Sequence, residues 1–353
     1  MNLPKNVRVV IAGRGQRFRF PRRWRGWYDM TNAISRLGEF PVTVKLGYLL
    51  PTREAIMQGH PEVRPMLDAA KQAGDLGFDS IWVGDSLFAR PRHDPITLLA
   101  AVGAAVPDVE LGTAVLLSAL RNPVVLAQQL ATVDQISEGR LIIGAGIAAD
   151  VPSVRAEFTA AGVPFEGRVG RMMEGFELCR ALWTGEPVSW DGRWQLEERV
   201  LAPVPYRPEG PPIWLAAGVP AGIERAAKHY DGWFPIGPDA KTFAERQSHL
   251  LQAAETAGRE ADDLTTAMYL TVAVMDDPAT AETAINAYLE DYYGAPAKVM
   301  RQIQACRGGN IADVIAFIQS YVAAGAEHLV IRIVGEHGPT LEALAEHRAD
   351  LVL

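Results

Sequence analysis

From residue 44 onward, short runs of apolar, β-branched residues alternate with longer segments whose apolar residues recur at helical spacing. Eight runs have the length of a strand: residues 44–50, 80–83, 109–115, 141–147, 213–217, 232–236, 267–275 and 328–334. Most are apolar throughout, which is typical of parallel strands buried on both faces. Eight such strands joined by helices over about 300 residues predict an α/β fold, a (β/α)8 TIM-type barrel.

The segments between these runs carry helix signals at their ends. Asn122 followed by Pro123 predicts a helix start, with Asn as the N-cap and Pro at the first helical position. Gly139 then ends that helix, and Asn310 and Gly325 bracket a later one in the same way. The helical segments therefore alternate with the strands as a barrel requires.

A doubly wound open sheet is the competing fold. That fold normally carries a glycine-rich turn after its first strand, whereas Pro51 and Thr52 follow the first run here. The longest irregular stretch, residues 148–212, includes a hairpin signal at 190–194 and a proline-rich loop at 203–212. We expect this stretch to be an insertion between strands 4 and 5 of a single domain, residues 41–353.

The first 40 residues differ in composition from the rest. They hold nine Lys and Arg but two acidic residues, with arginines and aromatics mixed at 14–27. One interpretation is an arm that binds nucleic acid. A second is an export signal at Arg22-Arg23, although no apolar segment follows it. We expect residues 1–40 to form a poorly ordered basic extension.

Charge and cysteine content exclude several classes of protein. The whole chain has 34 basic and 42 acidic residues, which leaves 25 basic and 40 acidic residues after residue 40. An acidic body of this kind argues against a nucleic-acid partner. No apolar run approaches the ~18 residues of a membrane span. The two cysteines, Cys179 and Cys306, lack CxxC spacing, and the seven histidines lack ligand spacing. We expect a cytoplasmic protein without a metal.

Small residues recur where the predicted strands end. The ends are 84–86 (GDS), 144–146 (GAG), 216–220 (AAGVP) and 237–238 (GP). One glycine alone is an ordinary turn, but four such ends around one barrel mouth predict a pocket for a large cofactor. Pro220 begins a helix whose free N–H groups suit a phosphate. Asp85 either accepts a hydrogen bond from a ligand or caps its own turn.

Three motifs and their order resemble the luciferase-like flavin-dependent oxidoreductases. They are 111–115 (LGTAV), 121–127 (RNPVVLA) and 131–140 (ATVDQISEGR), followed by Gly144-x-Gly146. The resemblance covers about residues 44–335. It implies a TIM-type barrel that binds FMN, or the deazaflavin coenzyme F420, at the carboxyl ends of its strands. It also implies a non-prolyl cis peptide at the end of strand 3, which here is Ala114–Val115, and a phosphate-contacting loop at 216–219.

The resemblance assigns a set of cofactor-binding residues: Asp85, Ala114, Val115, Asn122, Gly144, Gly146, Ala216, Ala217, Gly218, Val219 and Gly237. Members that dehydrogenate sugar phosphates with a deazaflavin carry Asp-His after strand 2 and an acid after strand 4. This chain has Ser86 and Ala149 at those places, and Ile147 replaces an arginine of the light-emitting members. The sequence thus assigns no catalytic residue from the family pattern. The candidates that it offers at the mouth are Asp85, Ser86 and His93.

The resemblance and the motifs leave three functions open. The first is a monooxygenase that uses reduced FMN and O2 on a small organic substrate, with a separate flavin reductase and a dry pocket. The second is hydride transfer with a deazaflavin, which needs no oxygen. The third is a non-catalytic barrel that binds a flavin or another ligand. We expect the loops 51–63, 86–95 and 148–212 to shape the pocket, and the family resemblance implies a homodimer.

Overall fold

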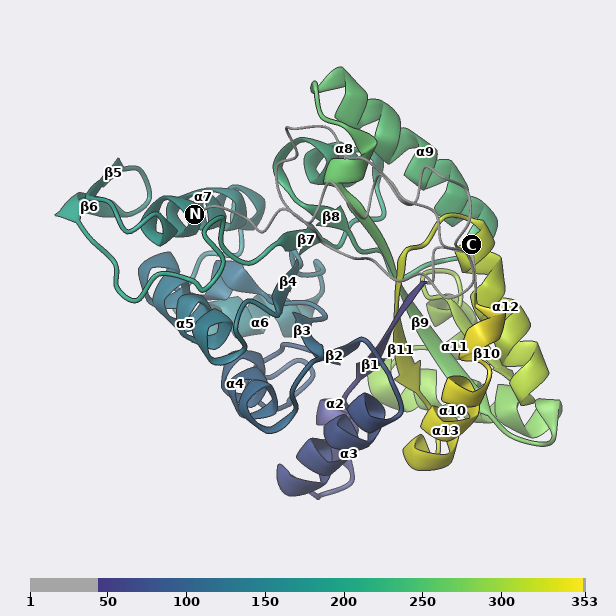
Figure 1. Ribbon diagram of the computed structural model, residues 1–353. Helices are drawn as coiled ribbons and strands as arrows, with labels where there is room; N and C mark the ends of the chain where they lie inside the picture. Colours follow the sequence, from purple (N-terminus) through teal and green to yellow (C-terminus); the bar gives the residue numbers. More distant parts are fainter. Residues whose placement is uncertain (1–43, 352–353) are drawn as a thin grey trace, which may run out of the picture. The chain divides into compact units, whose positions relative to one another are not determined.

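The computed structural model describes residues 44–351, and their strands form a closed parallel barrel (Figure 1). The eight barrel strands are β1 (Lys45–Leu49), β2 (Ser80–Val83), β3 (Glu110–Thr113), β4 (Leu141–Ala145), β7 (Ile213–Leu215), β8 (Gly232–Trp233), β9 (Thr265–Val274) and β11 (His328–Ile333). They follow the order β9-β11-β1-β2-β3-β4-β7-β8, and β8 pairs with β9 to close the ring. All eight predicted strands and the TIM-type barrel are confirmed.

Helices surround this ring of strands (Figure 1). They are α2 (Thr52–Met57), α3 (Arg64–Asp75), α4 (Pro95–Ala105), α5 (Pro123–Ile136), α6 (Pro152–Ala160), α7 (Arg168–Trp183), α8 (Pro220–His229), α9 (Ala240–Thr256), α10 (Pro278–Tyr293), α11 (Ala297–Met300), α12 (Ile311–Ala323) and α13 (His337–Glu346). The two predicted N-caps are confirmed, since Asn122 accepts from the N–H of Val124 at 2.9 Å and Asn310 from that of Asp313 at 3.0 Å. The C-caps are Ser137 and Ala324, with Gly139 and Gly325 just beyond them. Within residues 44–351, no helix is long and apolar enough to cross a membrane.

One strand of the sheet escaped prediction. β10 (Cys306–Gly309) pairs in parallel with the second half of β9, Cys306 opposite Thr271. Its sequence has two glycines and no β-branched residue, so it carries no strand signal. It pairs because β9 is ten residues long while its neighbour β8 is two, which leaves backbone groups of β9 without a partner in the barrel.

Aromatic side chains fill the barrel interior. The ring centroid of Trp82 lies 5.1 Å from that of Phe234 and 5.5 Å from that of Trp214. Tyr269 completes the group at 6.3 Å from Phe234. Gly112 makes room for this packing, because a Cβ there would lie 2.1 Å from the Trp82 ring. The middle of the interior is thus packed with aromatic rings, with the buried side chains of Ser80 and His328 against them.

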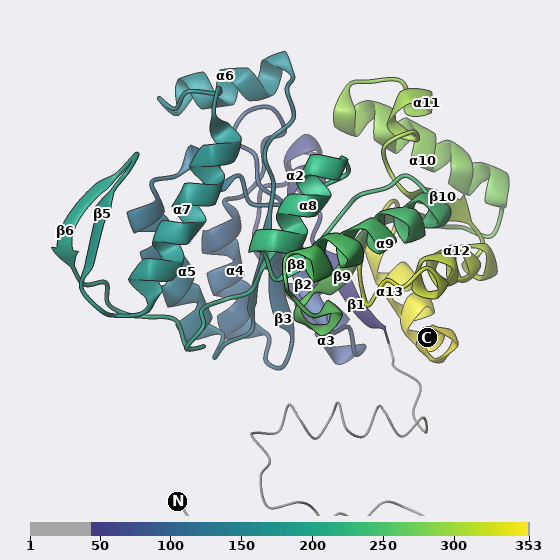
Figure 2. The same ribbon diagram turned by 90° about the horizontal axis from the view of Figure 1, so that it is seen from above.

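The chain between β4 and β7 leaves the regular alternation. It contains α6, α7 and the antiparallel strands β5 (Val188–Asp191) and β6 (Gln195–Arg199), which lie beyond α7 in Figure 2. The hairpin predicted at 190–194 is confirmed. Arg207 fastens the proline-rich loop to α5, where its Nη2 donates to the fully buried carboxylate of Asp134 at 3.0 Å. The predicted extension at residues 1–40 lies outside the described residues.

Candidate functional site

The end of β3 supplies the floor of the barrel mouth. The peptide bond between Ala114 and Val115 is cis, and both residues are half-buried. Their side chains pack on the interior aromatic cluster that includes Trp82 and Phe234. The chain beyond is tied to β4, because the N–H of Leu116 donates to the Gly144 carbonyl at 2.7 Å. The bond assigned from the family resemblance is therefore cis, and it lies on an apolar platform.

Two glycines of β4 and its following turn let this segment lie close to β4. A Cβ on Gly144 would stand 2.0 Å from the backbone oxygen of Thr113, and one on Gly146 would stand 2.4 Å from Cγ2 of Val115. Both positions are buried. The structure therefore requires these glycines for packing beneath the cis bond, and a side chain at Gly144 would displace the floor of the mouth.

The loop after β7 presents free backbone donors. Ala216 and Ala217 are half-buried, whereas Gly218 and Val219 are exposed where α8 begins. Within the described part of the chain, the N–H groups of 217–219 and 221 make no hydrogen bond. Unpaired N–H groups at a helix N-terminus fit a phosphate, so this loop suits the phosphate of a flavin-type cofactor.

Asp85 lies at the mouth, and its carboxylate is already paired. It is held by the guanidinium of Arg121 and by the N–H of Leu117, which donates to Oδ2 at 2.9 Å. Asn122, next to Arg121, uses its side-chain oxygen to cap α5. Gly237 is buried, and a Cβ there would lie 2.7 Å from the carbonyl oxygen of Ile303. These three residues hold the framework of the mouth, and direct contact with a cofactor stays a prediction for them.

The two other candidate catalytic residues also have partners within the protein. Ser86 is buried and donates its hydroxyl to Oε1 of Glu157, a fully buried residue of α6, at 2.6 Å. His93 is half-buried and its Nε2 lies 2.8 Å from the carbonyl oxygen of Pro61. Both side chains are therefore used to hold loops together, Ser86 through Glu157 and His93 through Pro61. Their catalytic role stays a prediction.

A cluster of arginines and tyrosines at the mouth was missed by the sequence analysis. Its centre is Arg332 in β11, a fully buried residue whose side chain extends into the top layer of the barrel above Val330. Arg332 donates to Thr271 at 3.0 Å, to the Tyr293 hydroxyl at 2.9 Å and to Gln304 at 2.6 Å. The signal was an arginine inside the run 329–334, whose other residues are all apolar.

Four tyrosines surround this guanidinium. Its Cζ lies 4.9–5.6 Å from the ring centroids of Tyr269, Tyr288, Tyr292 and Tyr293. Burial raises the pKa of Tyr269, and it would raise that of Tyr293. Arg332 and the hydrogen bond with Gln304 outweigh burial at Tyr293 and bring its pKa below the ordinary value of a tyrosine. The cluster thus places one buried guanidinium among four phenol rings.

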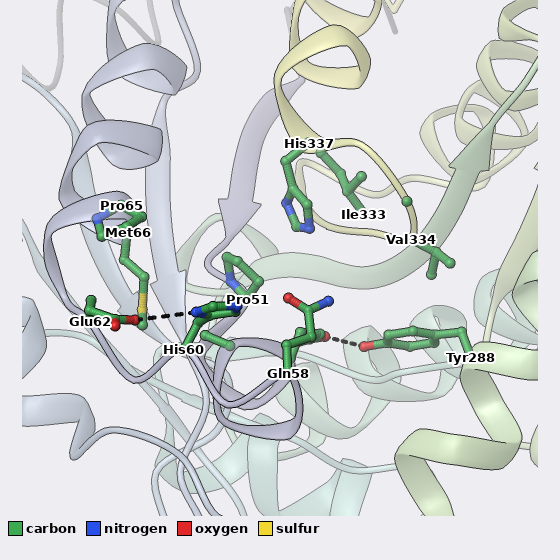
Figure 3. A pocket seen from close by; sticks show the side chains of 13 residues that line it. Pro51, Gln58, His60, Glu62, Pro65, Met66, Tyr288, Ile333, Val334 and His337 are labelled. Carbon is green, nitrogen blue, oxygen red and sulfur yellow. Dashed lines mark hydrogen bonds and ion pairs between the residues drawn. The ribbon is translucent and has the colours of Figure 1, made fainter.

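A cavity of about 360 Å³ lies beside the mouth, at the carboxyl ends of β1 and β11 (Figure 3). Tyr288 extends toward it from α10 and His337 from the start of α13. Tyr288 donates its hydroxyl to Glu54, which also lines the cavity. None of the predicted cofactor residues lines this cavity. It therefore adjoins the arginine–tyrosine cluster rather than the platform at Ala114–Val115.

Comparison with known proteins identifies the family. Residues 44–339 match the model of the luciferase-like monooxygenases. The chain belongs to this family, and it is an oxidoreductase of the luciferase-like type with a flavin or deazaflavin cofactor.

Three individual proteins show the range of the family. The chain is 30% identical over 319 residues, 81% of its length and 91% of the relative, to an F420-dependent glucose-6-phosphate dehydrogenase from Kineococcus radiotolerans. It is 30% identical over 277 residues, 69% of its length and 72% of the relative, to a phthiodiolone/phenolphthiodiolone dimycocerosates ketoreductase from a Mycobacterium species. Monooxygenase RslO1 from Streptomyces bottropensis has a similar structure, with a TM-score of 0.73 and 25% identity over 86% of this chain and 98% of that one.

Proposed function

We propose that the chain transfers a hydride between the deazaflavin coenzyme F420 and a small organic substrate. The observation that carries this proposal is the F420-dependent relative that aligns with 81% of the chain at 30% identity. The platform at Ala114–Val115 and the free N–H groups at 217–219 fit the ring and the phosphate of such a coenzyme. When bound, the coenzyme supplies the hydride donor or acceptor.

The chain's own residues bind the coenzyme and exclude water from the site. Trp82, Phe234 and Tyr269 close the barrel below the platform, so water reaches the mouth from outside and not through the barrel. Gly144 and Gly146 keep the platform in place. The N–H groups at 217–219 and 221 would hold the phosphate, and the guanidinium of Arg246 lies beside them, 3.6 Å from the Cβ position of Gly218.

Glucose 6-phosphate is not the substrate that we propose. Ser86 and Ala149 stand where the sugar-phosphate dehydrogenases carry a histidine and an acid, and Ser86 is bonded to Glu157. An acid–base pair of that type is therefore missing from these two positions.

The second candidate is a monooxygenase that uses reduced FMN and O2. The similarity to monooxygenase RslO1 supports it. The apolar platform suits the three-ring system of FMN as well as that of F420. Calorimetric titration of the full-length chain with F420 and FMN, each oxidised and reduced, distinguishes the two. We expect F420 to bind at least about tenfold more tightly, a difference of ~1.4 kcal/mol. Tighter binding of FMN, with oxygen consumption on substrate addition, would favour the monooxygenase.

A substitution in the phosphate loop tests the same proposal. Gly218→Asp places a negative charge beside the free N–H groups, and we expect F420 to bind at least about tenfold more weakly because like charges repel. Gln195→Glu, an equal change of charge on exposed β6, is the matched control and leaves the dissociation constant unchanged. Equal affinities of the two variants for F420 would show that this loop does not bind the phosphate.

A further inference from the structure

We infer that the barrel mouth binds an oxyanion, a carboxylate or phosphate carried by the substrate, between Arg53, Arg90 and Arg92. The inference rests on the proposed function for the identity of the reacting molecule. The anion site itself is independent of which coenzyme binds.

Three arginines, one from α2 and two from the loop after β2, meet at the rings of α10. The guanidinium carbons of Arg53 and Arg92 lie 4.8 and 5.8 Å from the ring centroid of Tyr292. That of Arg90 lies 4.9 Å from the centroid of Tyr293. Arg53 follows β1 and the other two follow β2, so the barrel topology brings them to the same side of the mouth.

None of these arginines makes an ion pair within residues 44–351. Together with Arg332 the group has four guanidinium ions, and the charge of Glu54 acts on Arg53 and Arg92. Burial lowers the pKa of Arg53, the charge of Tyr292 raises it, and the charges of Arg92 and Arg90 lower it further. Arg53, Arg90 and Arg92 are half-buried, and like charges that are partly withdrawn from water are costly unless a counter-ion joins them. A bound anion would supply the missing charge.

Arg92 donates to the Arg90 carbonyl oxygen at 3.1 Å and to the Tyr292 hydroxyl at 2.9 Å, but donors of the other two arginines are unused. Nε and Nη1 of Arg53 are buried and have no hydrogen-bond partner within the described residues. The Arg90 guanidinium likewise makes no hydrogen bond there and lies against the Tyr293 ring. A guanidinium stacked on an aromatic ring keeps its N–H edge available, and that edge matches the two oxygens of a carboxylate or phosphate.

The position of the group favours the substrate over the phosphate of the coenzyme. The loop after β1 is opposite the loop after β7, because four steps around the ring separate these strands in either direction. The predicted phosphate loop 216–219 is therefore across the mouth from Arg53. Arg92 instead lies beside the platform, since a Cβ on Gly84 would stand 1.9 Å from its Nη1 and 3.5 Å from the Ala114 oxygen.

Calorimetry with the full-length chain tests the inference. The probes are benzoate and phenyl phosphate, and neutral benzamide is the control of similar shape. We expect the anions to bind at least about tenfold more tightly than benzamide, because charge-assisted hydrogen bonds hold them. Arg53→Met should raise the benzoate dissociation constant by about tenfold or more, and Arg53→Lys by less. Equal affinity for benzoate and benzamide would overturn the inference.

Two controls separate the possible outcomes. Arg199→Gln, at an exposed arginine of β6, should leave benzoate binding unchanged, and circular dichroism checks that each variant is folded. Benzoate should still bind after F420 has been added. If F420 abolishes that binding, the arginines hold the coenzyme's own anionic groups and the inference is wrong. If benzoate binding depends on Arg53 while neither F420 nor FMN binds, the proposed function fails and the anion site stands.

Discussion

Arg121 donates hydrogen bonds to both oxygens of the Asp85 carboxylate. Its Nη1 lies 2.5 Å from Oδ2 and its Nη2 3.1 Å from Oδ1. The Asp85 side chain is 2% exposed and that of Arg121 17%. Since the N–H of Leu117 shares the same carboxylate, the pair fixes the chain that follows the cis bond. Asp85 therefore acts as a positioning residue for the floor of the mouth.

Asp85→Asn should lower the free energy of unfolding by about 2 kcal/mol, because it leaves the largely buried guanidinium of Arg121 with a neutral amide and the carboxylate of Asp94, 3.2 Å away, as its partners. Urea unfolding measures the change. Asp150→Asn is the matched control, since Asp150 pairs with Arg155 at the surface and an exposed pair contributes at most about 1 kcal/mol. Equal losses in the two variants would contradict the role given to the Asp85–Arg121 pair.

Gly144→Ala should destabilise the chain by at least about 2 kcal/mol and abolish cofactor binding. The new methyl group would stand 2.0 Å from the Thr113 carbonyl oxygen, which belongs to the backbone and cannot rotate away. Gly218→Ala is the control for stability alone, because Gly218 lies in the proposed phosphate loop and its methyl group meets Nη1 of Arg246 at an ordinary 3.6 Å. Thermal unfolding should separate them, and a wild-type melting temperature for Gly144→Ala would refute the packing argument.

Glu157→Gln should loosen the loop after β2. Oε1 of Glu157 accepts from the Ser86 hydroxyl at 2.6 Å and from the N–H groups of Phe88 and Ala89 at 2.7 and 2.8 Å. A neutral amide accepts these bonds more weakly. Hydrogen exchange should accelerate at Phe88 and Ala89 and stay unchanged at Thr97, whose N–H is bonded to Asp94. Unchanged exchange at all three residues would show that the carboxylate does not hold the loop.

Stability should fall as the pH falls from about 6.5 toward 3. Burial lowers the pKa of His328 to about 3, and the charge of Lys45 contributes to the shift. Between these pH values the unfolded chain binds a proton that the folded chain does not, so acid favours unfolding. The stabilisation is complete above pH 6.5. Urea unfolding of wild type and His328→Asn across this range should show a shallower pH dependence in the variant, and equal slopes would contradict the assignment.

The sequence predicted the strands because the barrel buries them on both faces, and continuous apolar runs record that burial. The cis bond at Ala114–Val115 came from the family resemblance. The partners of Asp85 and Ser86 were not predictable, since Arg121 and Glu157 are 36 and 71 residues away along the chain. The arginine–tyrosine cluster was missed for the same reason, because Arg332, Arg53 and Tyr292 become neighbours only when the ring closes.

The contact of Glu157 with the loop after β2 also constrains how this mouth can diversify. Glu157 belongs to the stretch between β4 and β7, while its three donors belong to the loop that carries Arg90 and Arg92. The segment between β4 and β7 and the loop after β2, two walls of the opening, are therefore joined through the one carboxylate of Glu157. A related protein that lengthens either segment to admit a different substrate must replace this carboxylate or keep its hydrogen-bond donors within reach. We therefore expect changes of specificity in these two segments to arise together.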